Sequence, residues 1–384
     1  MHNLHLSLTE FRNESRVLKQ TNSLLRHGLF QSVTIVSLHA KGLAHHEILG
    51  TSRQLFRLAI KSRILPACLP FQILKYFEYC ARVVWLAARK RPSVVNAHAL
   101  SLLPLGILLK LIFGSILVYD PHELETEVEG LQGLRQKLSR LMERVCIRAV
   151  SLTITVGPAI RDWYLERYQL DNVVAVLNCP PLMEIKPPGR LREELGIDPQ
   201  QSICLYQGAL CVGRGIELLL ESFEQAEDDN TLLVCMGYGE LADEIKRVAT
   251  RCPRIFYFPA VSTSSILNYT VSANVGLVLT GLDDQLCLNN QYCLPNKLFE
   301  YAMAGIPIVC SPMSEMSRLL LEYKIGALID DASPISLRRS LTAVNSMDRD
   351  SLRLHFDEFN RRFNWEEQEK VMINAYQNYI FKRV

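Results

Sequence analysis

The 384-residue sequence has no paired-cysteine pattern. Its eleven cysteines are scattered, without a Cys-x-x-Cys pair or a cysteine–histidine spacing that suggests zinc. In a chain of this length, scattered cysteines are typical of reduced thiols, many of them buried, rather than of a disulfide framework. The sequence therefore predicts cytosolic thiols and gives no indication of a structural metal.

A secretory signal and an uninterrupted membrane span are also missing. Residues 3–8 are too short for a signal core and lack a cleavage site. The strongest candidate for a span, Leu102 to Val118, is interrupted by Gly106, Lys110 and Gly114. We interpret it as a buried helix over about 101–113, a turn at Gly114 and a strand ending at Tyr119. We expect a cytoplasmic protein, for which contact with the inner face of the membrane remains open.

The small net charge of +2 hides an uneven distribution. Residues 1–119 hold 15 Lys and Arg against 4 Asp and Glu. Such a basic region suits phosphate-bearing ligands or an anionic membrane surface, although an ordinary solvated surface would explain it equally well. No recognised nucleic-acid motif accompanies the charges, so we expect no nucleic-acid partner.

The first half alternates short apolar runs with amphipathic stretches, which predicts a parallel α/β domain. The expected strands are residues 4–8, 32–38, 94–97, 115–119, 152–156 and 173–177, and the clearest helical patterns are 14–27, 71–90 and 134–150.

Proline-rich segments at 178–181 and 186–189 indicate a linker, because dense proline ends regular structure. The alternation then restarts, with strands expected at 202–206, 231–236, 255–258, 275–279 and 307–310, and helices at 215–226, 241–249, 264–272 and 296–304. We predict Rossmann-like domains over 1–180 and 181–360, facing across a cleft, and a terminal helix within 361–384 that folds back onto the first.

Two glycine-bearing loops of the second half follow expected strands. Gly208 begins a loop that ends at Arg214 and Gly215, and Gly237 follows the next strand. Glycine lets the backbone approach an anion, and arginine can pair with two phosphate oxygens. Each loop alone is weak evidence, because ordinary strand–helix turns have the same composition.

The segment Pro295-Asn296-Lys297-Leu298-Phe299-Glu300 is the most informative. Pro295 or Asn296 is expected to begin a helix, whose free N–H groups near Asn296 and Lys297 would face a phosphate. Glu300, one turn further on, could accept two hydrogen bonds from a ribose diol. A capped surface helix is the alternative, which the two glycine loops make less favoured.

In the first half, polar residues follow expected strands. His122 and Glu123 come after the strand ending at Tyr119, and His98 gives a weaker signal of the same kind. The stretch Asn13 to Val17 lies where the first strand passes into the first helix, so Arg16 could serve a phosphate. We take His122, Glu123 and Arg16 as the catalytic candidates, although an isolated histidine is more often structural.

Together these segments resemble the family four retaining glycosyltransferases, which have the GT-B fold. The resemblance spans most of the chain and is most specific at residues 295–301. It implies that Arg214 neutralises the donor diphosphate, that Glu300 holds the ribose and that His122 lies near the donor sugar. It also implies that the reaction needs neither a divalent metal nor a cofactor. Tyr292 departs from the pattern, because it stands where the family carries the first of two paired glutamates.

The expected function is a retaining transfer of a hexose-type sugar from a nucleoside diphosphate sugar to a hydroxyl acceptor. A surface polysaccharide or lipid-linked glycan is the expected acceptor, since the region 65–91 combines apolar side chains with Lys and Arg. The donor-binding residues would be Gly208, Arg214, Gly237, Asn296, Lys297, Leu298 and Glu300. A non-catalytic protein that binds nucleotide or glycan, and a sugar-nucleotide epimerase of the same fold, are the alternatives.

Overall fold

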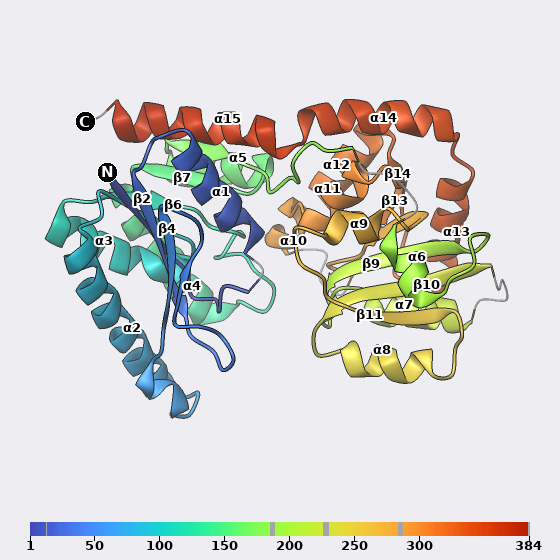
Figure 1. Ribbon diagram of the computed structural model, residues 1–384, viewed down its shortest axis with the longest axis horizontal. Coiled ribbons are helices and arrows are strands. Elements are labelled where there is room, and N and C mark those ends of the chain that lie inside the picture. Colours follow the sequence, from blue (N-terminus) through green and yellow to red (C-terminus); the bar gives the residue numbers. More distant parts are fainter. Residues whose placement is uncertain (13, 185–188, 226–229, 283–286, 383–384) are drawn as a thin grey trace. The chain divides into compact units, whose positions relative to one another are not determined.

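The computed structural model describes residues 1–382 apart from residues 13, 185–188, 226–229 and 283–286. The chain forms two compact units, which are treated separately (Figure 1). The first unit is Met1–Val176 together with Glu369–Val384, and the second is Leu177–Gln368. The chain thus leaves the first unit just before the segment 178–181 and returns to it within the last long helix.

The first unit is built on an eight-stranded sheet in the order β3-β4-β2-β1-β5-β6-β7-β8. All neighbouring strands are parallel except β3 and β4, which are antiparallel. The strands are β1 His2–Leu6, β2 Ser32–Leu38, β3 His46–Ile48, β4 Arg53–Leu58, β5 Val94–Ala97, β6 Ile116–Tyr119, β7 Leu152–Thr155 and β8 Val173–Ala175.

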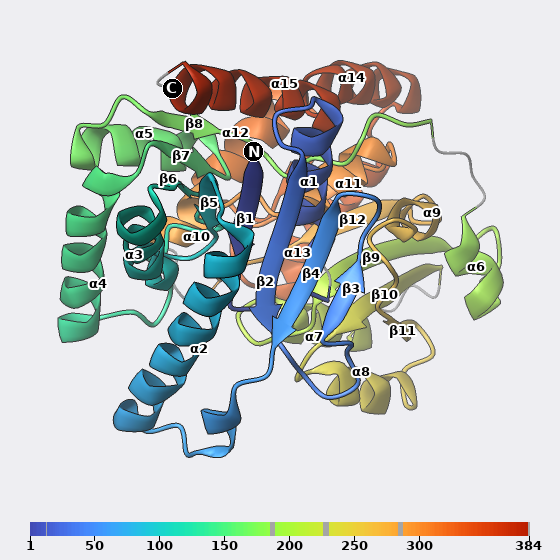
Figure 2. The same cartoon turned by 60° about the vertical axis from the view of Figure 1, so that its left-hand side comes forward.

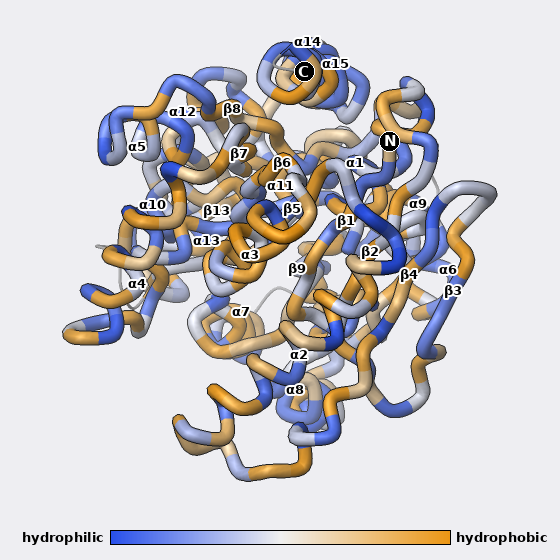
Figure 3. Tube along the Cα trace, turned by 90° about the vertical axis from the view of Figure 1, so that its left-hand side faces the viewer, coloured by the Kyte–Doolittle hydropathy of each residue, from blue (hydrophilic) through white to orange (hydrophobic). Residues whose placement is uncertain are grey.

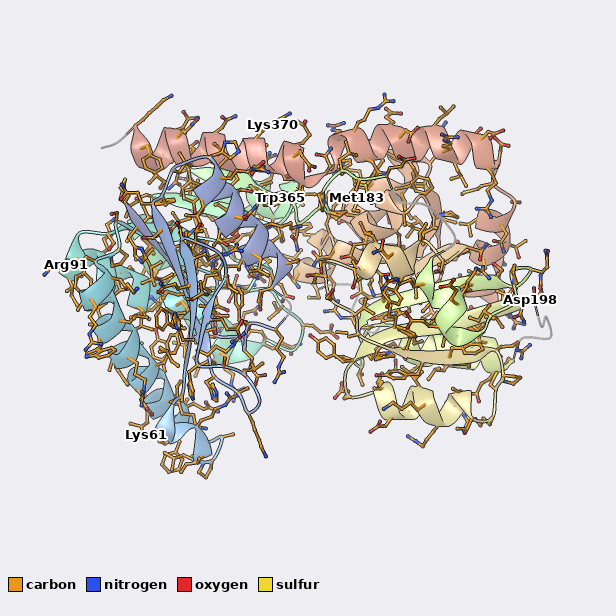
Figure 4. All side chains as sticks on the ribbon, viewed as in Figure 1. Lys61, Arg91, Met183, Asp198, Trp365 and Lys370 are labelled. Carbon is orange, nitrogen blue, oxygen red and sulfur yellow. The ribbon has the colours of Figure 1, made fainter. Side chains whose placement is uncertain are left out.

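Helices connect these strands and cover the sheet (Figure 2). They are α1 Ser15–Arg26, α2 Leu69–Lys90, α3 Leu103–Phe113, α4 Gly133–Cys146 and α5 Pro158–Tyr168. Helix α3 packs between α2 and α4 and against β5 and β6. Lys61 and Arg91, labelled in Figure 4, lie beyond the two ends of α2.

The apolar run at 102–118 is a helix, a turn and a strand, as expected. Gly114 ends α3 with a φ of 68°, a left-handed conformation that glycine adopts without steric cost. The expectation of a buried helix was only half right. The helix is apolar except at Lys110 (Figure 3), yet Leu108, Leu111 and Ile112 are exposed. Among the described helices, none is both long and apolar enough to cross a membrane.

The chain returns to the first unit along α15, Trp365–Tyr376. Tyr376 is buried, its ring meets the Phe30 ring edge-on, and its hydroxyl accepts a hydrogen bond from Asn96 Nδ2 at 2.5 Å. Tyr379, in the π-helical segment Gln377–Phe381 that continues α15, donates to the carbonyl of Asp171 at 2.8 Å. These contacts attach the end of the chain to the sheet of the first unit.

The second unit contains a six-stranded, wholly parallel sheet in the order β11-β10-β9-β12-β13-β14. The strands are β9 Ser202–Ala209, β10 Thr231–Tyr238, β11 Ile255–Pro259, β12 Val275–Val278, β13 Ile308–Cys310 and β14 Gly326–Leu328. Successive side chains point to opposite faces, so Leu205 joins one hydrophobic core while Cys204 and Tyr206 join the other.

Helices cover both faces of this sheet, as its two cores require. They are α6 Arg190–Leu195, α7 Ile216–Glu224, α8 Ala242–Ala249, α9 Ile266–Thr270, α10 Leu288–Tyr292, α11 Asn296–Met303, α12 Ser314–Tyr323, α13 Pro334–Asn345 and α14 Arg349–Arg362. The prediction of two Rossmann-like α/β domains is confirmed. Part of the predicted proline-rich linker, residues 186–188, lies outside the described residues.

Candidate functional site

Two glycines bring the ends of β9 and β10 unusually close together in the second unit. Gly208 and Gly237 are paired across the two strands. A Cβ atom on Gly237 would lie 1.9 Å from the carbonyl oxygen of Gly208, and Gly208 itself has a φ of +119°. Both positions therefore require glycine, and they expose backbone at the carboxyl edge of the sheet, where ligands of such sheets bind.

Arg214 lies in the loop that follows β9, immediately before α7. Its Nη1 donates a hydrogen bond to Thr280 Oγ1 at 3.2 Å, and Thr280 is itself held by a bond from its N–H to Ser311 Oγ at 2.9 Å. The next residue, Gly215, has a φ of +70°, and a Cβ there would lie 2.5 Å from Leu279 Cβ. Arg214 is thus positioned by a tight glycine turn on one side and by a threonine hydroxyl on the other.

Helix α11 begins at Asn296, as expected, with Pro295 in extended conformation before it. No side chain of the described residues caps this N-terminus. Asn296 is exposed, and its Oδ1 accepts a hydrogen bond from Asn178 Nδ2 at 2.9 Å. An uncapped helix start carries partial positive charge and N–H groups that suit an anion.

Lys297 lies in the first turn of α11. Its Nζ is 3.7 Å from the centre of the Tyr206 ring, a cation–π contact. Burial and the positive charge of Arg214 lower the pKa of Lys297 to about 7, although the Glu300 carboxylate opposes the shift. Arg214, Lys297 and Glu300 are therefore close enough to influence one another, and their role in donor binding stays a prediction.

Glu300 is held by a network that the sequence did not reveal. Gln207 Nε2 donates to Glu300 Oε2 at 2.5 Å, and Gln207 Oε1 accepts from Thr270 Oγ1 at 2.9 Å. The Tyr301 hydroxyl accepts from the Gln207 N–H at 3.0 Å and donates to the Leu205 carbonyl at 2.8 Å. Gln207 is 1% exposed, so its amide has little freedom to leave the carboxylate.

Leu298 differs from its expected role in donor binding. Its side chain is fully buried in the core, and its N–H donates to the Pro295 carbonyl at 3.0 Å. Both groups are occupied within the protein, so Leu298 anchors α11 rather than facing a ligand. Tyr292, at the position of the family's first paired glutamate, ends the short helix α10.

In the first unit, Asp120 organises a polar cluster where β5 and β6 end. Arg16, from the first turn of α1, donates to Asp120 Oδ1 through Nη2 at 2.6 Å and Nε at 3.1 Å, and through Nη1 to the Val176 carbonyl at 2.6 Å. Burial alone would raise the pKa of Asp120, but Arg16 and His98 outweigh it and hold that pKa well below its ordinary value. The carboxylate is thus charged although it is fully buried.

This arrangement corrects the expectation that Arg16 serves a phosphate. The Arg16 side chain is only 4% exposed, and each of its guanidinium nitrogens has a partner inside the unit. Its role is to position and neutralise Asp120. Asn13, the first residue of the stretch that suggested a phosphate contact, lies outside the described residues.

His122 belongs to the same cluster, whereas Glu123 does not. His122 Nε2 lies 3.2 Å from His98 Nδ1 and 3.9 Å from Asp120 Oδ2, and about a third of its side chain is exposed. Burial lowers the pKa of His122 to about 3; the Asp120 charge opposes this shift, and His98 adds to it. His122 is therefore a neutral ring that reaches the surface, while Glu123 is exposed.

Partial signals for the supporting residues are present in the sequence. His98 follows β5 and Asp120 follows β6, and these strands are parallel neighbours, so their ends meet. Strand adjacency would have singled out this pair. Gln207 and Thr280 gave no comparable signal, because a buried amide and a threonine after a strand are common in any α/β sheet.

Known proteins resemble the chain in both sequence and fold. The model of Glycosyltransferase Family 4 matches residues 15–180. The α-maltose-1-phosphate synthase of Mycobacterium tuberculosis is 24% identical over 290 residues, which cover 70% of this chain and 72% of that protein. The D-inositol 3-phosphate glycosyltransferase of Xylanimonas cellulosilytica is 23% identical over 194 residues, covering 48% of this chain and 44% of that protein.

Solved structures show the same fold over the whole chain. Sucrose-phosphate synthase from Thermosynechococcus elongatus superposes with a TM-score of 0.80 at 15% identity, covering 100% of both chains. Anabaena HepE, solved in complex with UDP-glucose, has a TM-score of 0.73 at 13% identity and covers 98% of this chain and 100% of its own.

The chain has the GT-B fold, and these matches support a glycosyltransferase activity. The predicted resemblance to the family four enzymes is thereby confirmed.

Proposed function

We propose that the protein transfers a hexose-type sugar from a nucleoside diphosphate sugar to a hydroxyl acceptor, with retention of the anomeric configuration. The observation that carries the proposal is the grouping of Arg214, Lys297 and the uncapped start of α11 beside Glu300. Two cations and a helix N-terminus suit a diphosphate, and a carboxylate suits the two ribose hydroxyls. The UDP-glucose complex of the structurally similar HepE supports this class of donor.

In this proposal the chemical step is the departure of the nucleoside diphosphate. Negative charge grows on the leaving diphosphate, and Arg214, Lys297 and the N–H groups of α11 stabilise it in the transition state. These groups supply the charge that a divalent metal would otherwise provide. As the bond between the anomeric carbon and the diphosphate breaks, the acceptor oxygen bonds that carbon on the same face of the sugar and gives its proton to the leaving phosphate, so no enzymatic nucleophile is needed. His122 contacts the sugar or orients the acceptor.

A transfer assay with a panel of nucleotide sugars tests this function. The wild type should release nucleoside diphosphate in the presence of EDTA, and NMR of the product should show the anomeric configuration of the donor. Glu300→Ala and Arg214→Ala should each abolish turnover, whereas Arg247→Ala, at an exposed arginine of α8, should not. Donor binding without turnover would favour the non-catalytic alternative, and an isomerised nucleotide sugar would favour the epimerase.

We further propose that the acceptor is presented at an anionic membrane surface. Leu134, Leu138, Leu141 and Val145 repeat every three or four residues along α4, a spacing that normally faces a core. Here their exposed fractions are 72%, 56%, 57% and 64%. Exposed Arg135, Lys137 and Arg144 accompany this apolar stripe of α4. An apolar face flanked by basic residues suits the headgroup region of anionic lipids.

Helix α2, the region that first suggested membrane contact, has a similar face. Val83 and Leu86 are buried in the core of the first unit, whereas Leu69, Ile73, Phe77 and Trp85 are exposed along one side. Arg89 lies over the Trp85 ring, 3.3 Å from its centre. Helix α3 packs against both α2 and α4 and also exposes Leu108, Leu111 and Ile112, so all three neighbouring helices of the first unit carry exposed apolar residues.

A further inference from the structure

Three atoms able to ligate a metal converge in the polar cluster of the first unit. His98 Nδ1 lies 3.1 Å from Asp120 Oδ2 and 3.2 Å from His122 Nε2, and the remaining distance, from His122 Nε2 to Asp120 Oδ2, is 3.9 Å. Zinc binds imidazole nitrogen and carboxylate oxygen at about 2.0 to 2.2 Å, so two ligands of a tetrahedral ion lie about 3.3 to 3.6 Å apart. The two shorter separations are close to that range, and the third exceeds it by about 0.3 Å, a difference that small side-chain shifts would remove.

The hydrogen bonding of Asp120 depends on which nitrogen of His98 carries the proton. Both guanidinium bonds of Arg16 to Asp120 go to Oδ1, so among the described residues the buried Oδ2 faces His98 Nδ1 at 3.1 Å and His122 Nε2 at 3.9 Å. A neutral imidazole carries one N–H proton. His98 Nδ1 and His122 Nε2 together therefore present at most two protons, and His122 presents one at Nε2 only in the tautomer whose Nδ1 is unprotonated. Oδ2 therefore has a hydrogen-bond donor when His98 is protonated on Nδ1, and in the other tautomer of His98 a metal ion bound by all three atoms would satisfy it.

The surroundings orient the candidate ligands as a metal site requires. His98 Nε2 lies 2.8 Å from Nδ1 of the fully buried His5, and the two rings are stacked. With a metal on Nδ1, His98 carries its proton on Nε2 and donates it to His5, the outer contact that fixes the ligand tautomer in metal sites. Arg16 holds the other carboxylate oxygen. The partly exposed His122 leaves an open side for water as a fourth ligand.

We propose that His98, Asp120 and His122 form a binding site for a divalent transition-metal ion of the zinc class. Two imidazoles and a carboxylate are the ligands of open zinc sites. The nearby Arg16 charge weakens the attraction for a cation, so the site is reversible rather than structural. The site differs from the proposed diphosphate site, whose Arg214, Lys297 and Glu300 belong to the second unit. Because metal binding takes the Nε2 lone pair of His122, an occupied site withdraws that ring from the transfer reaction; this consequence rests on the proposed function.

A cobalt titration of the full-length, tag-free protein tests the site without relying on activity. One equivalent of Co²⁺ should give visible d–d bands of a four-coordinate ion, without the thiolate charge-transfer band that binding to cysteine would produce. Zn²⁺ should displace it. His122→Gln and His98→Gln should each weaken binding by about 100-fold or more, since even loss of an outer hydrogen bond costs about 10- to 100-fold. His5→Phe, which removes such an outer hydrogen bond, should weaken Co²⁺ binding by about 10- to 100-fold.

A matched control uses another pair of neighbouring histidines. His39 and His45 are stacked with ring centres 3.8 Å apart, and His45→Gln should leave the cobalt spectrum and affinity unchanged. Circular dichroism confirms that each variant is folded, and the partly exposed His122 is the variant least expected to disturb folding. The proposal is overturned if Co²⁺ gives no such bands, or if both His98→Gln and His122→Gln bind as tightly as the wild type. Zn²⁺ inhibition of transfer that His98→Gln relieves would add support, whereas failure of the transfer assay itself would count only against the proposed function.

Discussion

Lys297 places its ammonium nitrogen 3.7 Å from the centre of the Tyr206 ring, in a half-buried position next to the charge of Arg214. The aromatic face partly replaces the water that the ammonium loses. Even so, burial and Arg214 lower the pKa of Lys297 to about 7. The residue expected to meet the donor diphosphate is thus poised to titrate near neutral pH.

The first prediction is a pH-dependent donor affinity. A diphosphate favours the charged form of Lys297, so the donor binds best below pH 7. Above pH 7 the free protein must first take up a proton, and affinity should fall by up to about tenfold per pH unit. The Kd of a nucleotide sugar, measured from pH 6 to 9, checks this. Lys297→Arg keeps its positive charge throughout this pH range and should flatten the dependence of Kd on pH. An equally steep dependence in that variant would show that a group other than Lys297 titrates.

Gln207 is predicted to position Glu300 for the ribose. Gln207→Leu removes the donor at 2.5 Å from the carboxylate and should raise the donor KM by roughly 10- to 100-fold, the effect of a hydrogen bond to a charged group. Thr270→Val removes the hydroxyl that bonds Gln207 Oε1 and the Ile266 carbonyl but leaves the Gln207–Glu300 bond, and should have a smaller effect on KM. If Gln207→Leu changes thermal stability but not KM, the network serves the core alone.

The Arg16–Asp120 pair is predicted to be a stability element. Arg16→Met leaves a fully buried carboxylate without its cation and should lower the free energy of unfolding by about 3 to 5 kcal/mol. Arg12→Met, which breaks an exposed pair with Glu10, should cost less than about 1 kcal/mol. Urea denaturation at pH 7 measures both, and equal losses would contradict this assignment.

The same pair predicts a loss of stability in acid. The pKa of Asp120 in the folded protein lies below its unfolded value of about 3.9, so its stabilisation is complete above that pH and is lost as the pH falls. Denaturation curves between pH 2 and 6 should show a steeper acid loss for the wild type than for Arg16→Met.

Membrane docking is predicted to depend on the apolar stripe of α4. Wild-type protein should float with liposomes that contain anionic lipid, and the double variant Leu138→Gln/Leu141→Gln should remain at the bottom of the gradient. A matched pair of exposed leucines in the second unit, Leu321→Gln/Leu354→Gln, should float as the wild type does. Wild-type protein that fails to float would exclude this surface as a membrane contact.

The sequence predicted the fold well wherever local pattern and buried position agree. Strands β2 and β5 occupy the residues expected for them, because apolar β-branched runs are buried on both faces. Strand β4 was missed. It carries Arg53 and Arg57, and the Arg57 guanidinium is buried because it bonds the carbonyls of Glu10, Phe11 and Ala44. These carbonyls, which make the burial of the Arg57 charge possible, lie outside β4, so the sequence of β4 itself does not indicate that its arginines can be buried.

The candidate site shows the same division. Arg214, Lys297 and Glu300 were assigned to donor binding because glycine turns and helix starts have local signatures, and that assignment stays a prediction. The pairing of Arg16 with Asp120 could not be predicted from local pattern. Asp120 is distant in sequence, and the order of the strands brings it next to Arg16. Leu298 was assigned by its position in the motif, but its spacing places it on the buried side of α11.

Isothermal titration with UDP and with GDP tests the central claim, that the grouping around α11 binds the nucleoside diphosphate of the donor. The account predicts binding of at least one of the two by the wild type, loss of that binding in Glu300→Ala and Arg214→Ala, and unchanged binding in Arg247→Ala. Undiminished binding in both Glu300→Ala and Arg214→Ala would contradict it.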